Sequence, residues 1–151
     1  MKFSAALVVF SLLLVTSITA QQFGTQQVIT TNADSARSVY ATDLDGDGDA
    51  DVLSASQHDN KIAWYENLGC GTFATEQTIS SNANGARSVY ATDLDGDGDA
   101  DVLSASYFDD KIAWYENTGG GTFGPQQVIT TNADCASSVY ATDLDGDGDA
   151  D

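Results

Sequence analysis

Basic residues are scarce in this chain of 151 residues, which has 5 Lys and Arg against 23 Asp and Glu. A phosphate backbone is bound by clustered Lys and Arg side chains, so the composition argues against nucleic-acid binding. Proline is equally scarce, with 1 residue, yet hydrophobic residues make up 42% of the chain. Ordinary disordered chains lack that apolar content. We therefore expect a folded, strongly acidic protein with a modest core.

Long apolar runs are absent after residue 20, and no later stretch has a helical apolar period. Residues 1–20 combine Lys2, an apolar run broken by Ser11, and small residues before Ala20. This pattern is typical of a cleaved secretory signal peptide. A membrane anchor is the alternative, but the run is shorter than the roughly 18 to 20 apolar residues needed to span a bilayer. The sequence thus predicts a secreted, extracellular protein.

Recognisable catalytic sets are also missing. The chain has 1 histidine, His58, which has no counterpart in the other repeats. The sequence shows no nucleophile for it to activate and no residue to orient it. We find no Ser–His–Asp set, Gly-rich phosphate loop or zinc signature. We expect His58 to be an exposed loop residue and expect no catalysis from this part of the chain.

A repeat of 50 residues is the strongest positive feature, because Ser38–Asp51 recurs unchanged from Ser88 and from Ser138. Each copy predicts four short strands separated by Gly- and Asp-rich turns. The expected strands of the first copy are residues 38–44, 51–56, 61–67 and 77–80, and 27–30 and 127–130 match the fourth of them. The repeat units are residues 36–85, 86–135 and 136–151, the last of them incomplete. The predicted fold class is all-β, with β-propeller blades of four antiparallel strands in residues 21–151. A solenoid is the structural rival, although fifty residues per unit is long for it.

Aspartate is concentrated in one loop of each repeat. Five carboxylates within nine residues repel one another unless a cation neutralises them, and an all-oxygen ligand set selects a hard cation. The three sets are Asp43, Asp45, Asp47, Asp49 and Asp51; Asp93, Asp95, Asp97, Asp99 and Asp101; and Asp143, Asp145, Asp147, Asp149 and Asp151. With Asp43 at position 1, the spacing matches the first half of the EF-hand ligand order, with a glycine at position 6. An EF-hand itself is disfavoured because position 12 is Ser54 and the flanking residues are typical of strands.

The pattern Asp-x-Asp-x-Asp-Gly-x-x-Asp between two strands resembles the calcium loop of FG-GAP repeats, also called VCBS repeats. Phe23-Gly24 and Phe123-Gly124 match the Phe-Gly dipeptide of that family, whereas Phe73-Ala74 departs from it. The resemblance implies the propeller fold of integrin α-chains and of many secreted proteins, some of them lectins. It also implies that calcium is bound by Asp43, Asp45, Asp47, the Asp49 carbonyl and Asp51, and by the matching residues of the other two copies. A solvated acidic turn without metal, or a calcium buffer without a rigid fold, are the alternatives.

The propeller hypothesis assigns the loops to two faces. All Asp-rich loops lie on one face, and the basic residues Arg37, Lys61, Arg87 and Lys111 lie on the other. Most differences between copies fall on that second face, where 57–60 becomes 107–110. We expect a glycan or protein ligand there, with neutral drift of exposed loops as the alternative.

Aromatic residues and cysteines fit the same arrangement. Trp64-Tyr65 and Trp114-Tyr115 suggest sugar stacking, but adjacent strand residues point to opposite sides, and packing between blades is favoured. Cys70 and Cys135 fall on opposite faces of different blades. Their mutual disulfide is therefore disfavoured against free thiols or partners beyond Asp151.

The repeat pattern is open at both ends, because propellers typically need 4 to 8 blades. We expect the chain to be a fragment with about two complete blades. The predicted function is a secreted calcium-binding propeller for adhesion or recognition, with structural calcium and no transmembrane segment. The alternatives are a non-catalytic accessory propeller of a secreted enzyme whose catalytic domain lies beyond Asp151, and a nonfunctional product of the repeats.

Overall fold

A computed structural model of the protein describes residues 24–146 and 150–151. The expected signal peptide, residues 1–20, lies outside this part, as do Asp147 and Asp149. Within it the chain forms strands and no helix, so it contains no helix that could span a membrane.

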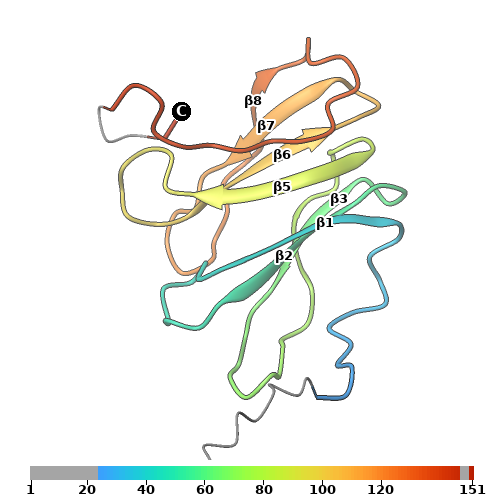
Figure 1. Ribbon diagram of the computed structural model, residues 1–151, viewed down its shortest axis with the longest axis vertical. Coiled ribbons are helices and arrows are strands. Elements are labelled where there is room, and N and C mark those ends of the chain that lie inside the picture. The colour runs from blue at the N-terminus through green and yellow to red at the C-terminus, as the bar shows by residue number, and fades with distance from the viewer. Residues whose placement is uncertain (1–23, 147–149) are drawn as a thin grey trace, which may run out of the picture.

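Two four-stranded antiparallel sheets make up the molecule (Figure 1). Their strands follow one another in sequence order, as the fifty-residue repeat predicts. Blade 1 consists of β1 (Ala36–Thr42), β2 (Asp51–Ser56), β3 (Lys61–Tyr65) and β4 (Gln77–Ser80). Blade 2 consists of β5 (Ala86–Thr92), β6 (Asp101–Ser106), β7 (Lys111–Tyr115) and β8 (Gln127–Thr130). The all-β fold with four-stranded propeller blades is therefore confirmed.

The strands differ from the predicted ones in two ways: the first strand ends earlier, at a turn, and two predicted strands have no neighbouring strand to pair with among the described residues. The first strand ends at Thr42 rather than Leu44, because Asp43 already accepts a hydrogen bond from the amide of Gly46 in the loop. Residues 27–30 and 138–142 form no strand, since neither segment pairs with a strand in the described part of the chain. The third repeat nevertheless begins its hairpin, because Thr142 and Asp151 exchange two backbone hydrogen bonds of 3.0 and 3.3 Å.

The hydrophobic core lies between the two blades. Blade 1 contributes larger side chains and blade 2 contributes smaller ones together with Tyr115. The buried set is Leu44, Leu53, Ala55, Ile62 and Trp64 against Ala83, Ala86, Val89, Ala91, Val102 and Tyr115. Trp64 is 3% exposed and meets the edge of Phe123 at a centroid distance of 6.4 Å, which confirms its predicted role in packing between blades.

Turns of the two blades gather on two opposite sides. The amide of Asn67, after β3, donates to Asp51 at the start of β2, so the acidic loop lies beside the β3–β4 turn. On the other side, the amide of Ala83 in the link between the blades donates to the carbonyl of Asn60 in the β2–β3 turn. Figure 1 shows the β1–β2 and β5–β6 loops, which are the acidic loops of the two blades, along the same edge of the molecule.

Candidate metal sites and their surroundings

Three aspartates of each acidic loop bring their carboxylates together. One oxygen from each lies within 4.8 Å of the others. The three triads are Asp43, Asp45 and Asp51; Asp93, Asp95 and Asp101; and Asp143, Asp145 and Asp151. These are positions 1, 3 and 9 of the predicted ligand order, so residues six to eight positions apart converge through the folding of the loop.

Backbone amides close each loop around its first aspartate. Asp43 accepts hydrogen bonds from the amides of Gly46, at 2.7 Å, and Gly48, at 2.9 Å. Gly48 has a φ of 93°, a conformation that side-chain-bearing residues rarely adopt, which explains the glycine at position 6. Asp93 repeats both contacts with Gly96 and Gly98. Hydrogen bonds within the chain therefore define the shape of the loop without an ion.

Asp51 and Asp101 anchor the loops to the sheets. Asp51 is fully buried and accepts amide hydrogen bonds from Leu44, at 2.9 Å, and Asn67, at 2.8 Å. Asp101 is bound in the same way by the amides of Leu94 and Asn117. Each carboxylate oxygen keeps a further lone pair after accepting one hydrogen bond. The sequence indicated these residues as ligands and did not reveal their second role as anchors of two turns.

Asp47 and Asp49 lie outside the triad. Asp47 accepts a hydrogen bond from the amide of Asp49 at 2.8 Å, and both residues are exposed. An Asp49 carboxylate oxygen lies 3.6 Å from where a Cβ on Gly69 would be, so this side chain is near the β3–β4 turn. Asp97 and Asp99 repeat the arrangement beside Gly119. The ligand roles predicted for positions 5 and 7 therefore stay predictions.

Two carboxyl groups of these clusters, those of Asp101 and Asp45, have a raised pKa. Burial is the main cause that raises the pKa of Asp101, and the negative charges of Asp95 and Asp97 raise it further. The hydrogen bonds that Asp101 accepts from the amides of Asn117 and Leu94 lower it, but they do not outweigh these effects. Burial likewise raises the pKa of Asp45, the amide of Asp47 lowers it, and the charges of Asp51, Asp47 and Asp43 raise it. A cation among the carboxylates would oppose this repulsion.

The donor set fits a hard divalent cation. Calcium takes 6 to 8 oxygen ligands at about 2.3–2.6 Å, and three convergent carboxylates supply a large part of such a shell, leaving the remainder to backbone carbonyls and water. Histidine and cysteine, which softer metals prefer, are absent from the three triads.

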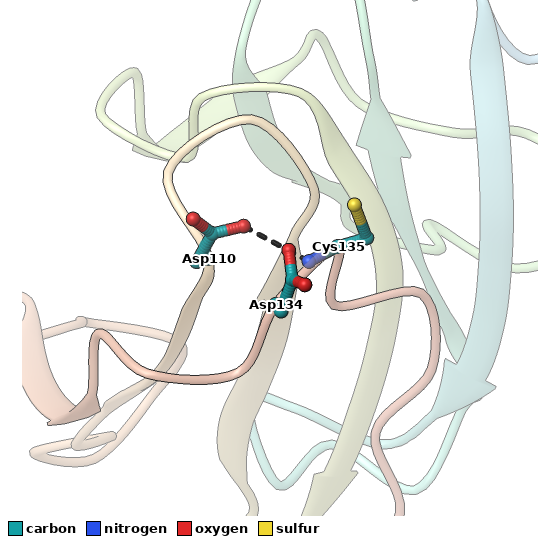
Figure 2. A group of neighbouring side chains, drawn as sticks. All are labelled: Asp110, Asp134 and Cys135. Atoms are coloured by element: carbon teal, nitrogen blue, oxygen red, sulfur yellow. Dashed lines mark hydrogen bonds between the residues drawn. The ribbon is translucent and has the colours of Figure 1, made fainter.

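A further group on the opposite side has a different character. Asp110, Asp134 and Cys135 also bring one ligand atom each within 4.8 Å (Figure 2). Asp110 accepts a 2.9 Å hydrogen bond from the amide of Cys135. In the preceding repeat the neutral Asn60 makes the same contact with the amide of Gly85, at 2.8 Å. The contact is therefore a repeated structural link between a β2–β3 turn and the next blade.

Aromatic and cationic side chains gather beside that link in blade 2. The guanidinium carbon of Arg87 lies 3.6 Å from the ring centroid of Tyr107, which meets Phe108 edge-on at 5.3 Å. Phe108 is 58% exposed and covers Gly85 so closely that a Cβ there would lie 2.5 Å from its ring. A hydrogen bond with Cys135 raises the pKa of Tyr107. We call Arg87, Tyr107 and Phe108 the aromatic cluster.

Blade 1 has polar residues at the corresponding places. Arg37 donates a 2.7 Å hydrogen bond to Gln57, and exposed His58 lies 3.7 Å from Asp34. The sequence differences between the copies thus change a polar surface into an aromatic one. Cys70 and Cys135 are both free and exposed.

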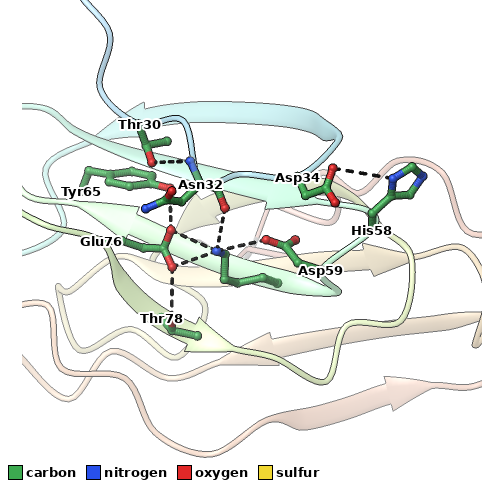
Figure 3. A network of polar contacts seen from close by, with 9 residues as sticks. Thr30, Asn32, Asp34, His58, Asp59, Tyr65, Glu76 and Thr78 are labelled. Carbon is green, nitrogen blue, oxygen red and sulfur yellow. Dashed lines mark hydrogen bonds and ion pairs between the residues drawn. The ribbon is translucent and has the colours of Figure 1, made fainter.

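Lys61 connects blade 1 to the chain that precedes it, in a network of polar contacts that includes Asn32, Asp59 and Glu76 (Figure 3). Its ammonium group forms ion pairs with Asp59, at 3.0 Å, and Glu76, at 2.9 Å, and donates to the carbonyl of Asn32 at 3.1 Å. Lys111 makes the equivalent contact with the carbonyl of Asn82 at 2.7 Å. Both lysines therefore hold links between repeats, a role that the sequence did not indicate.

Comparisons with known proteins place this geometry in a family. No curated protein matches the chain. A solved structure, described as the basis of specific recognition of non-reducing terminal N-acetylglucosamine by an Agrocybe aegerita lectin, is similar with a TM-score of 0.51 and 24% sequence identity. The similarity covers 66% of this chain and 26% of that one, and at this identity it supports the fold alone. The family model of the FG-GAP-like repeat matches residues 43–104 and 93–151. The chain therefore belongs to the FG-GAP-like repeat family.

Proposed function

We propose that this chain supplies blades of a secreted β-propeller that is stabilised by calcium and recognises a glycan or a protein. The observation that carries the calcium assignment is the threefold recurrence of a carboxylate triad within one loop geometry. Calcium in this position joins the β1–β2 loop to the β3–β4 turn through Asp51, so its role is structural.

Direct binding tests the calcium assignment. Mature protein is titrated with calcium by calorimetry, and its melting temperature is compared in millimolar calcium and in excess chelator. A ligand at a hundred times its Kd stabilises the folded state by about 2.7 kcal/mol per site. An unchanged melting temperature together with no binding heat would reject the assignment.

The aromatic cluster is the proposed recognition surface. Exposed Phe108, with Tyr107 beside it, offers apolar area, and Arg87 adds a positive charge in a strongly acidic protein. Arg87 Nε is buried and has no hydrogen-bond partner in the described part of the chain. The similarity to a lectin structure supports a glycan as the first ligand class to test. We assign this surface no catalytic role.

A glycan array that includes non-reducing terminal N-acetylglucosamine, followed by titration of any hit, tests recognition. Tyr107→Gln with Phe108→His converts the cluster to the residues of blade 1 and provides a matched variant. Loss of binding with an unchanged melting temperature supports the surface, whereas unchanged affinity rejects it. Secretion is tested separately by N-terminal sequencing of the exported protein, for which Gln21 is the expected first residue.

A further inference from the structure

Gly85, in the link between the blades, is the residue on which the ring of Phe108 rests. A Cβ at position 85 would lie 2.5 Å from Cδ2 of Phe108 and within 3.1 Å of two further ring atoms. Gly85 is buried, and its amide donates a 2.8 Å hydrogen bond to Asn60 in the turn of blade 1. Since the link is held in place, a side chain at position 85 would displace the ring.

The backbone conformation of the link does not explain the glycine. The φ of Gly85 is 70°, a region that favours glycine, but the equivalent residues Ser35 and Cys135 have φ values of 57° and 56°. Both carry a side chain in the same conformation, so two of the three copies do without a glycine. The feature that requires a glycine at this position of blade 2 is therefore the ring of Phe108.

Backbone hydrogen bonds hold the β6–β7 turn against the link in the same way as the β2–β3 turn of blade 1. The amides of Tyr107 and Phe108 donate to the carbonyls of Gly85, at 3.0 Å, and Asn84, at 3.1 Å. In blade 1 the amides of residues 57 and 58 make the equivalent bonds, at 3.1 and 3.2 Å. The two turns thus differ in their side chains and share these backbone contacts.

Phe108 is held on two sides and is open to solvent elsewhere. Its ring contacts the link at Gly85 and meets the Tyr107 ring edge-on at 5.3 Å, yet the residue is 58% exposed. An unrestrained side chain at the surface changes rotamer within nanoseconds. A side chain that is already ordered loses less entropy when a ligand binds to it. The ring of Phe108 is therefore a preorganised apolar surface.

Polar groups of both signs lie beside Tyr107, the neighbour of Phe108. The guanidinium of Arg87 is held over the Tyr107 ring at 3.6 Å. The hydroxyl of Tyr107 is hydrogen-bonded to Cys135, whose amide donates to the carboxylate of Asp110. A guanidinium only donates hydrogen bonds and a carboxylate only accepts them, whereas a hydroxyl group does both. A neutral ligand that carries several hydroxyl groups fits this mixture of charges.

We propose that Gly85 positions Phe108 as a stacking surface for a neutral pyranose, with Arg87 binding its hydroxyl groups. The face of an aromatic ring is negative and attracts the slightly positive C–H groups on one face of the sugar. One sugar ring can be covered by one phenylalanine, whereas a stable protein interface needs about 800 Å² per partner. The inference rests on the proposed recognition role of the aromatic cluster, and it names the class of ligand and a positioning residue.

Proton NMR tests the position of the ring without a ligand. In the full mature chain with millimolar calcium, the α protons of Gly85 should be shifted by the ring current of Phe108. Phe108→Leu should remove this shift. If the α protons of wild type are unshifted, the ring does not lie on Gly85 in solution and the proposal is overturned.

Gly85→Ser is the central variant for binding, because Ser35 shows that this backbone accepts a serine. Chitotriose and cellotriose are the probes, titrated by NMR and calorimetry. We expect Gly85→Ser to lower the affinity about tenfold, the effect of losing an aromatic contact, with an unchanged melting temperature. Ser35→Gly, in blade 1, is the matched control and should leave the affinity unchanged. Wild-type affinity in Gly85→Ser overturns the positioning role and leaves recognition by the aromatic cluster intact.

A double variant separates binding from stability. Gly85→Ser with Phe108→His recreates the pair found in blade 1, so its melting temperature should equal that of wild type even if Gly85→Ser alone lowers it. Its affinity should stay low, because the stacking surface is gone. Wild-type affinity in the double variant would overturn the proposal, since a purely structural role predicts that stability and binding recover together.

The ligand class has its own test in the wild-type chain. If neither chitotriose nor cellotriose binds at millimolar concentration, the assignment of a neutral pyranose is overturned, and recognition of a protein remains from the proposed function. If an oligosaccharide containing glucuronic acid binds while the two neutral probes do not, the assignment is overturned in favour of an acidic glycan.

Discussion

Asn117 reaches across the boundary between the blades, where its Nδ2 donates a 2.8 Å hydrogen bond to the carbonyl oxygen of Leu44, 73 positions earlier in the chain. The same residue follows β7 immediately, and its amide donates to the buried carboxylate of Asp101. One residue therefore links the acidic loop of its own blade, through its backbone amide, to that of the preceding blade, through its side chain.

Replacing Asn117 tests the value of this link. Asn117→Ala leaves the buried Leu44 carbonyl without its partner, and we expect a loss of about 1–3 kcal/mol in the free energy of unfolding. Asn67→Ala is the matched control, because Asn67 makes the same contacts within its blade. Urea unfolding measures both. Equal losses in the two variants would show that the contact between blades contributes nothing.

Asp45→Asn should have opposite effects with and without calcium. In chelator it relieves the repulsion that helps to raise the pKa of Asp45, and we expect a gain of roughly 0.2–1 kcal/mol, the range for exposed charge pairs. In calcium it removes a ligand, and a tenfold loss of affinity corresponds to about 1.4 kcal/mol. Asp49→Asn, outside the triad, is the control. A loss in both conditions would contradict the proposed site.

Gly121→Ala tests the packing of Trp64. A Cβ at Gly121 would lie 2.5 Å from the Trp64 ring, whereas at Gly71, the equivalent position, it would meet nothing within 4 Å. Both glycines have positive φ, 69° and 77°, so the backbone strain of an alanine is shared. We expect Gly121→Ala to cost about 1–3 kcal/mol more than Gly71→Ala through overpacking. Unfolding curves with tryptophan fluorescence measure the difference. A similar cost for both would mean that Trp64 relaxes freely.

Lys61 should make stability depend on pH in the alkaline range. Burial lowers its pKa, but the hydrogen bonds and charges of Glu76 and Asp59 outweigh this, so the pKa is raised above 10.5. Its contribution is therefore complete below pH 10.5 and is lost as the pH rises through the folded-state pKa. Lys61→Met should cost about 1.5–3 kcal/mol at neutral pH, the range for hydrogen bonds to charged groups.

The difference between Lys61→Met and wild type should shrink as the pH is raised above 10.5, because the wild-type lysine then loses its charge. Glu76→Gln, which introduces the residue found at position 126, should remove part of this dependence. A difference that stays constant up to the highest pH at which the protein folds would show that the ion pairs contribute nothing.

Local pattern and spacing predicted much of this architecture. The strand-favouring Tyr, Val and Thr of residues 38–44 and the turn-rich segments between strands predicted four strands per repeat. Trp64 was correctly assigned to packing between blades. What the sequence did not reveal are contacts whose partners belong to other repeats. The bond from Asn117 to Leu44 and that from Lys111 to the Asn82 carbonyl depend on how one blade is placed against the next. A backbone carbonyl as acceptor leaves no signature in the sequence.

In the acidic loops, too, the sequence predicted some features and did not reveal others. Spacing predicted that positions 1, 3 and 5 converge, whereas the carboxylates that lie together belong to positions 1, 3 and 9. It also gave Asp51 no role beyond that of a ligand. Its burial and its two amide donors follow from the return of the chain after β3, which brings Asn67 beside it. The repeated Asn at positions 67 and 117, directly after the Trp-Tyr-Glu segment, was the available signal, because a recurring polar residue at a strand end marks a turn contact.

Sequence identity between β1 and β5 has a consequence for folding. Ala36–Thr42 and Ala86–Thr92 are the same seven residues, so β6 cannot distinguish them by side chains. Chain connectivity alone makes the choice. Closing β1 onto β6 needs a connection about sevenfold longer than its own hairpin, which costs roughly 2 kcal/mol more in loop entropy. This difference in loop entropy is small, and it arises from the unfolded chain rather than from contacts of the folded protein. Exchange of strands between repeats, and between chains at high concentration, is thus the natural misfolding route of this protein.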